Sequence, residues 1–307
     1  MNRVIINFDA LRHNLRAINR LMERQGARWS IVTKGLCGHQ ATIKALELLG
    51  ARSVADSRLD NLSAINAISP GLEKWYLRLP HLSVIEDVVR LADVSLNSEI
   101  KVIKSLSEEA QRQDKIHHIV IMIELGDLRE GILPGTLVRF YEEAFNQPAI
   151  NVLGVGAQIG CLAGAVPNVD QISQLLLYRE LLELKFARQL HMVSAGSTAF
   201  LPLLTDGGMP RGVNHYRIGE ALFLGTDLVN GGTLDGFRDD VVFLDGEIAE
   251  IKVKSLTPMA ETGTSTPFEG LEPDKNNAPA TGQRGYRALV TVGQLETDVA
   301  GLTPVNS

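Results

Sequence analysis

Short apolar runs alternate with amphipathic helical segments eight times over the first 230 residues. The run from His118 to Glu124 is apolar almost throughout, which is typical of a strand covered on both faces. Asn168 and Gln171 predict a capping box for the helix that runs to about residue 188. The alternation therefore favours a parallel sheet covered by helices. The expected strands are residues 30–34, 52–55, 75–79, 94–96, 118–124, 150–157, 190–193 and 216–218.

Two α/β architectures fit eight such units, a closed (β/α)8 TIM-type barrel and an open doubly wound sheet. The open sheet needs a Gly-rich first turn, with an acid about twenty residues further on. The turn after the strand at residues 30–34 contains only Gly35 and Gly38. The pattern therefore predicts the barrel, over residues 1–230.

The character of the chain changes after residue 230. Residues 241–244 and 247–253 have the alternating faces of antiparallel strands, and residues 287–292 predict one more strand. Residues 257–285 are rich in Pro, Gly, Thr and Asn and predict a long loop. We therefore expect a small β domain over residues 231–307, incomplete because few strands are available to close it.

Composition narrows the classes of partner. The chain has 307 residues, 45% of them hydrophobic, which is enough for a large core. A net charge of −6 without runs of like charge argues against nucleic acid or an anionic membrane surface as a partner. No apolar stretch reaches membrane-spanning length and no signal-peptide pattern opens the chain. With only Cys37 and Cys161 present, we expect a cytoplasmic protein without disulfides.

Lys34 stands where the first barrel strand ends. An ammonium group at that position would be buried, which is costly without a partner charge or covalent use as a Schiff-base amine. The ordinary alternative is a side chain that reaches out to solvent from the strand end. Active sites of such barrels are built at the C-terminal ends of the strands, so Lys34 is a candidate site residue.

Other polar residues follow the later strands at the same end of the barrel. The turn from Ala195 to Thr198 offers backbone N–H groups, a hydroxyl and a helix start, all of which favour a phosphate. The ordinary roles would be a helix cap for Ser197, a structural ion pair for Arg217 and a solvated charge for Arg129. An amine, a phosphate cradle and two arginines suggest pyridoxal 5′-phosphate (PLP), and we predict no metal site. The residues concerned are Arg129, Gln158, Ser197, Thr198, Arg217, Gly219 and Glu220.

Five segments carry a specific resemblance. The chain resembles the alanine racemase-like (fold-type III) group of PLP enzymes, closest to the ornithine/alanine racemase branch of amino-acid racemases. The resemblance covers residues 3–230 and implies a homodimer that interconverts L- and D-amino acids by Cα proton exchange. It implies ornithine or another basic or small amino acid as substrate. The matching segments are Val32–Gly35 with Gly38, Ala55–Asn61, Ser95–Glu99, Leu125–Gly131 and Asn214–Ala221.

The resemblance also implies roles for single residues. Lys34 would hold PLP as a Schiff base and, when released, carry a proton on one face of the substrate Cα. Arg217 would face the pyridine nitrogen of the cofactor. Arg129 would reach the phenolic oxygen of PLP or the substrate carboxylate, where a planar guanidinium fits.

The phosphate would lie against Thr198 and the backbone of Gly219 and Glu220, with Ser197 beside them. Two positions depart from the alanine racemase pattern. Cys37 replaces a phosphate-binding tyrosine, and Gln158 replaces a histidine that lies against the ring.

The second proton carrier of the family is a tyrosine from the partner subunit, and Tyr178, Tyr216 and Tyr286 do not match its context. Cys161 is a candidate by position, although a buried small apolar side chain is the more ordinary role for a cysteine. Two other functions stay open: a non-catalytic PLP-binding protein of cofactor homeostasis, and a barrel lyase that binds a sugar phosphate through Lys34. The acids near the barrel mouth that could meet a distal substrate amine are Glu124, Asp127, Glu130 and Glu220.

Overall fold

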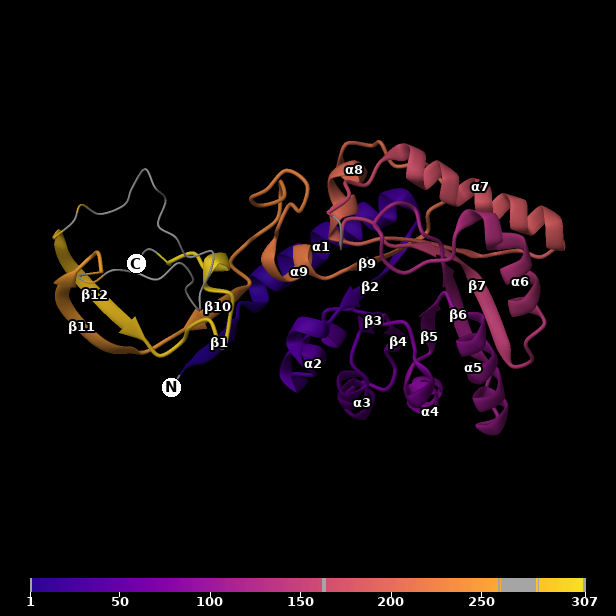
Figure 1. Ribbon diagram of the computed structural model, residues 1–307, viewed down its shortest axis with the longest axis horizontal. Helices are drawn as coiled ribbons and strands as arrows, with labels where there is room; N and C mark the ends of the chain where they lie inside the picture. Colours follow the sequence, from indigo (N-terminus) through magenta and orange to yellow (C-terminus); the bar gives the residue numbers. More distant parts are fainter. Residues whose placement is uncertain (1, 162–163, 259, 261–279, 281, 306–307) are drawn as a thin grey trace. The chain divides into compact units, whose positions relative to one another are not determined.

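The computed structural model describes residues 2–161, 164–258, 260, 280 and 282–305 (Figure 1). The chain divides into two compact units. The barrel unit comprises Ile6–Val241, and the β unit comprises Met1–Ile5 with Val242–Ser307. Within the described residues, no helix is both long and apolar enough to cross a membrane.

The barrel unit contains a closed barrel of eight parallel strands. The barrel closes where Arg28 on the first of these strands pairs with His215 on the last. The predicted (β/α)8 barrel is therefore confirmed, and the open sheet is excluded. The strands are β2 (Arg28–Val32), β3 (Ser53–Asp56), β4 (Glu73–Tyr76), β5 (Val94–Asn97), β6 (His117–Met122), β7 (Ile150–Ala157), β8 (Met192–Ala195) and β9 (His215–Ile218).

Helices surround the barrel strands, and α2 to α7 are seen on the outside of the sheet in Figure 1. The predicted capping box is confirmed, because the Gln171 amide donates to Asn168 Oδ1 (3.0 Å) and the Asn168 amide donates to Gln171 Oε1 (3.2 Å). The helices are α1 (Phe8–Gln25), α2 (Gln40–Leu48), α3 (Leu59–Ile68), α4 (Ile85–Leu91), α5 (Ile100–Arg112), α6 (Leu137–Phe145), α7 (Val169–Phe186), α8 (Leu201–Thr205) and α9 (Glu220–Leu224).

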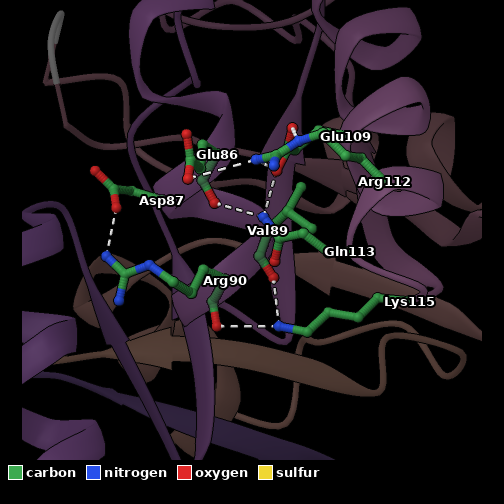
Figure 2. A network of polar contacts seen from close by, with 8 residues as sticks. All are labelled: Glu86, Asp87, Val89, Arg90, Glu109, Arg112, Gln113 and Lys115. Carbon is green, nitrogen blue, oxygen red and sulfur yellow. Dashed lines mark hydrogen bonds and ion pairs between the residues drawn. The ribbon is translucent and has the colours of Figure 1, made fainter.

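A polar network joins α4 to the end of α5 (Figure 2). Arg112 contacts Glu109 on its own helix at 2.7 Å and Glu86 on α4 at 3.4 Å. Lys115 Nζ donates to the carbonyl oxygens of Val89 (3.1 Å) and Arg90 (3.2 Å) near the end of α4. A cation at a helix C-terminus is favourable, whereas exposed charge pairs contribute little, so this network adjusts helix packing rather than forming a site.

The boundary between the units differs from the expected one at residue 230. Residues 226–241 stay with the barrel because Thr226 bridges to Thr233 and the backbone of Arg238 bonds Asn14. Asn14 Nδ2 donates to the Arg238 carbonyl (2.7 Å), and the Arg238 amide donates to Asn14 Oδ1 (2.8 Å). Val241 is fully buried and ends the barrel unit.

The β unit contains two two-stranded sheets. In one, β1 (Arg3–Ile6) pairs with β10 (Val242–Asp245). In the other, β11 (Ile248–Ser255) pairs antiparallel with β12 (Arg284–Val290). The three strands expected after residue 240 are confirmed, and most of the loop predicted over residues 257–285 lies outside the described residues.

The barrel interior is closed by side chains from strands that are not neighbours. Trp75 on β4 stacks on His215 on β9, with ring centroids 4.2 Å apart and ring planes 9° from parallel. Two strands, β3 and β2, separate β4 from β9 along the shorter way round the sheet, so the rings meet across the interior. An apolar layer surrounds Trp75, as expected for a packed barrel core. It consists of Ala55, Val94, Leu96, Val120, Met122 and Met192.

The buried His117 should make the stability of the barrel sensitive to acid. Its ring lies 2.8 Å from Ser95 Oγ, and burial, with smaller effects of His118 and Lys115, lowers the pKa of His117 from 6.5 to about 4. Between about pH 6.5 and about pH 4, the unfolded chain binds a proton at His117 and the folded protein does not. The contribution of neutral His117 to the free energy of unfolding is therefore complete above about pH 6.5 and is lost as pH falls towards about 4. The full loss is about 3 kcal/mol.

Urea unfolding followed by tryptophan fluorescence, at about pH 7 and about pH 4.5, tests this linkage. We expect His117→Gln, whose amide reaches Ser95, to lose about 2 kcal/mol less than wild type between the two pH values. The exposed His81→Gln should keep the wild-type difference. Equal pH dependence in wild type and His117→Gln would contradict the prediction.

Candidate functional site

Lys34 does not lie within a strand. β2 ends at Val32, and Lys34 opens a short 3₁₀ helix, Lys34–Leu36, with its side chain exposed. The expected buried ammonium is therefore wrong, because the chain turns out of the barrel wall before Lys34. Among the described residues, its Nζ has no hydrogen-bond or ion-pair partner. An accessible, unpaired amine at the C-terminal end of a barrel strand is still suited to imine chemistry.

The backbone before Lys34 is fixed by a buried carboxylate. Thr33 Oγ1 donates to Asp56 Oδ2 (2.9 Å), and the Thr33 amide donates to the Ala55 carbonyl (2.9 Å). Asp56 is fully buried and also accepts from the Arg58 amide (2.9 Å) and from Asn61 Nδ2 (3.1 Å). Asp56 thus links the Lys34 turn to the start of α3.

Arg217 is 3% exposed and lies inside the barrel, on the same face of β9 as His215. Its Nη1 donates to the carbonyl oxygen (3.3 Å) and to the hydroxyl of Ser194. Its Nη2 donates to the Ala157 carbonyl (2.9 Å) and to Gln158 Oε1 (3.0 Å). All these acceptors are neutral, so the structural ion pair considered for Arg217 is not formed with any described residue. A guanidinium has five N–H donors, and the Nε–H of Arg217 has no acceptor in the described part of the chain.

Two nearby charges act on Arg217 in opposite directions. Burial lowers the pKa of Arg217 to about 10, Glu130 counteracts this shift, and Arg129 adds to it. The guanidinium therefore remains charged at neutral pH. Glu130 is itself largely buried and contacts Arg129 Nε at 2.5 Å.

The loop after β6 positions Arg129. The Glu124 carboxylate accepts hydrogen bonds from the amides of Gly126 (2.5 Å), Leu128 (3.2 Å) and Arg129 (2.9 Å). Gly131 returns the loop at φ +154°, where a Cβ atom would lie 2.2 Å from the Glu124 nitrogen. This role of Glu124 could have been found from the sequence, because a carboxylate stands directly ahead of a turn that is flanked by glycines.

Cys161 is exposed, so the buried apolar role that is ordinary for cysteine does not apply. Arg129 Nη1 donates to Cys161 Sγ at 2.7 Å. The Cys161 amide donates to Asp127 Oδ2 at 3.1 Å, and Asp127 is fully buried. The loops after β6 and β7 are thereby joined around Arg129 and Cys161.

The residues predicted to hold phosphate gather where β8 and β9 end. Ser197 Oγ accepts from the Ala199 amide (3.4 Å), which is the capping role considered for it. Thr198 is 3% exposed, and its Oγ1 accepts from the Ala221 amide (3.1 Å) at the start of α9. Within the described chain, the amides of Gly219 and Glu220 have no acceptor, so they are free to bind an anion.

Gly219 is required by the close approach of β9 to β2. A Cβ atom at Gly219 would lie 2.9 Å from both the Cβ atom and the carbonyl oxygen of Val32. A larger residue would move the Arg217 strand end away from the turn that carries Lys34.

The structure places Tyr178, Tyr216 and Tyr286 in three different settings. The Tyr216 hydroxyl is buried without a partner in the described residues, and burial raises the pKa of Tyr216. Tyr178 lies on α7, and Tyr286 is 79% exposed on β12.

These groups fit the chemistry of PLP. Lys34 offers an accessible amine for an aldehyde, and Arg217 offers a ring nitrogen the one N–H that no described residue accepts. Free amides at Gly219 and Glu220, with the Thr198 hydroxyl, offer donors for a phosphate. Arg129 and Cys161 lie on neighbouring loops at the same end of the barrel.

Solved structures share this fold. The alanine racemase from Streptomyces coelicolor A3(2) superposes with a TM-score of 0.67 at 18% identity, over 83% of this chain and 68% of that chain. PipY of Synechococcus elongatus PCC7942, solved with PLP bound, gives a TM-score of 0.59 at 15% identity, over 69% of this chain and 99% of that chain.

Two relatives are similar in sequence to this chain over almost its whole length. The chain is 31% identical over 307 residues to an ornithine racemase of Acetoanaerobium sticklandii, covering 99% of this chain and 84% of the relative. It is 29% identical over 312 residues to a lysine racemase of Thermotoga maritima, covering 99% of this chain and 83% of the relative. The model of the alanine racemase N-terminal domain matches residues 6–227. With a barrel of that fold and this match, the chain belongs to the alanine racemase N-terminal domain family.

Proposed function

We propose that this protein is a PLP-dependent amino-acid racemase that exchanges the proton at the substrate Cα. The observation that carries the proposal is Arg217 at the C-terminal end of the barrel, a buried cation with four neutral acceptors and one N–H that has no acceptor among the described residues. The similarity to ornithine and lysine racemases supports the same reaction class.

Each group of the site has a place around the cofactor. Lys34 would bind the aldehyde carbon, and Thr198 with the amides of Gly219 and Glu220 would hold the phosphate. Ser197 fixes the turn beside them, and Gln158 orients Arg217. When bound, PLP supplies a conjugated ring that makes the substrate Cα–H acidic.

Arg217 limits how strongly the ring withdraws electrons. A guanidinium whose pKa is about 10 keeps its protons at neutral pH, so it would donate to the ring nitrogen without protonating it. An unprotonated ring nitrogen is a weaker electron acceptor. This favours reversible proton exchange over reactions that break further bonds.

Lys34 would remove and return the proton on one face of Cα. Inversion needs a second carrier on the other face. Cys161 is the candidate among the described residues, because its thiol is exposed and contacts Arg129 at the barrel mouth. Arg129 is at the same time placed to meet the substrate carboxylate or the phenolic oxygen of PLP.

We infer a basic amino acid as the substrate, in line with the two relatives. Three of the four acids considered for a distal amine are engaged: Glu124 accepts three amides, Asp127 accepts from Cys161, and Glu130 contacts Arg129. Glu220 is exposed, and its carboxylate has no partner in the described residues. It is the acid left to meet a distal ammonium group.

Incubation of PLP-loaded protein with single L-amino acids in D2O tests the proposal. We expect Cα deuterium and the D-isomer with ornithine or lysine, against alanine, serine and arginine as comparison substrates. Lys34→Ala should abolish the exchange and the visible absorption band of lysine-bound PLP. Lys44→Ala, an exposed lysine paired with Glu47, should change neither. The absence of exchange with all five amino acids would contradict the proposed racemase activity.

A Cys161→Ser variant tests the second carrier. If Lys34 and Cys161 serve opposite faces, this variant should still wash out the Cα proton of one enantiomer while producing about a hundredfold less of the other. The separate readouts are deuterium incorporation by mass spectrometry and enantiomer ratio by chiral chromatography. Unchanged racemisation would remove Cys161 from the reaction.

A non-catalytic PLP-binding protein is the second candidate function, favoured by the structural likeness to PipY. It predicts the absorption band, its loss in Lys34→Ala, and no exchange with any amino acid. A sugar-phosphate lyase would instead form an imine between Lys34 and its sugar-phosphate substrate, which borohydride would reduce to a stable adduct in protein free of PLP.

A further inference from the structure

A series of hydrogen-bonded, buried side chains starts at Arg217 and runs through the barrel interior. Ser194 Oγ lies 2.8 Å from His215 Nδ1, and His215 Nε2 lies 3.0 Å from Ser30 Oγ. Ser30 Oγ in turn lies 2.6 Å from Ser53 Oγ. These residues come from β8, β9, β2 and β3, so the chain of contacts crosses four strands.

The hydrogen bonds in this chain have one consistent direction. Arg217 can only donate, so Ser194 Oγ must accept from it. The Ser194 hydroxyl hydrogen then has one acceptor among the described contacts, His215 Nδ1. His215 Nδ1 therefore carries no proton, and the Nε2–H donates to Ser30, whose hydroxyl donates to Ser53.

The other tautomer leaves a group unsatisfied. With the proton on Nδ1, His215 would donate to Ser194, and the Ser194 hydroxyl hydrogen would have no acceptor. Ser194 is fully buried, and an unpaired buried donor is destabilising. Ser53, at the far end of this series of hydrogen bonds, is 9% exposed.

The surroundings also keep His215 neutral. Burial, and then the positive charges of Arg217 and Arg28, lower the pKa of His215 well below its ordinary value. One face of the ring is covered by Trp75, which carries no charge. A cationic His215 would donate from both nitrogens and could not accept from Ser194.

We propose that His215 is a positioning residue that acts through Ser194. As the neutral Nε2–H tautomer, it orients the Ser194 hydroxyl so that its oxygen accepts from Arg217 Nη1. The guanidinium is thereby held with its Nε–H free for the pyridine nitrogen of PLP. The inference rests on the proposed function for the cofactor, whereas the tautomer of His215 can be measured without it.

Two variants separate positioning from packing. In His215→Asn the amide oxygen occupies the place of Nδ1 and can accept from Ser194, whereas in His215→Gln the amide reaches the place of Nε2 and Ser30. Both variants lose the ring that stacks on Trp75. The two variants should therefore lose a similar free energy of unfolding in urea. They should differ only in whether residue 215 accepts from the Ser194 hydroxyl, which orients Ser194 toward Arg217.

We expect the dissociation constant for PLP to stay within about threefold of wild type in His215→Asn and to rise about tenfold or more in His215→Gln. The absorption band of bound PLP should shift only in His215→Gln. Ser194→Ala should resemble His215→Gln, and the double variant should be no worse than either single one, because both act on one contact. Equal losses in the Asn and Gln variants would reduce His215 to a packing residue.

Nitrogen-15 NMR of histidine-labelled protein free of PLP tests the tautomer directly, with the His215 signal assigned by its loss in His215→Asn. We expect a protonated Nε2 and a bare Nδ1, unchanged between about pH 5.5 and about pH 8. A protonated Nδ1, or titration in this range, would overturn the positioning role even if neither variant folds. Failure of wild type to bind PLP would instead overturn the proposed function and leave the NMR result to decide the contact with Ser194.

Discussion

The structure of the site depends on how the barrel accommodates one buried guanidinium. A buried cation is usually paired with a carboxylate, because desolvation is otherwise costly. Here Arg217 is held by neutral acceptors on β7, β8 and the residue after β7, and its charge is only partly compensated by Glu130 at a distance. Such a group keeps one directed N–H and a full positive charge available at the barrel end, where a ligand with a basic ring nitrogen can complete its contacts.

Charged and neutral parts of the site come from different parts of the fold. The barrel wall supplies Arg217 and its neutral acceptors, which are buried and fixed by the sheet. The loops supply Lys34, Arg129 and Cys161, which are exposed and held through their backbones. The carboxylates of Glu124 and Asp56 fix these loops by accepting hydrogen bonds from backbone amides and a hydroxyl. A rigid electrostatic centre surrounded by accessible reactive groups suits proton transfer on a bound cofactor.

Periodicity was enough to predict the barrel, because eight buried parallel strands leave a pattern in local sequence. The positions of Gln158 and Arg217 at C-terminal strand ends were also predicted, whereas the hydrogen bond between them was not. Two other features could not be predicted. The unit boundary depends on Asn14 binding the backbone of Arg238, a contact 224 residues apart in the chain. The neutral surroundings of Arg217 depend on side-chain directions that only the closed barrel defines.

The most direct measurement of the central claim is the protonation state of the cofactor ring when it lies against Arg217. PLP carrying nitrogen-15 in its ring can be bound to the protein and observed by NMR between about pH 6 and about pH 9. A guanidinium that donates without giving up a proton predicts the chemical shift of an unprotonated pyridine throughout this range. A protonated pyridinium in the wild-type protein at neutral pH would contradict the proposed role of Arg217.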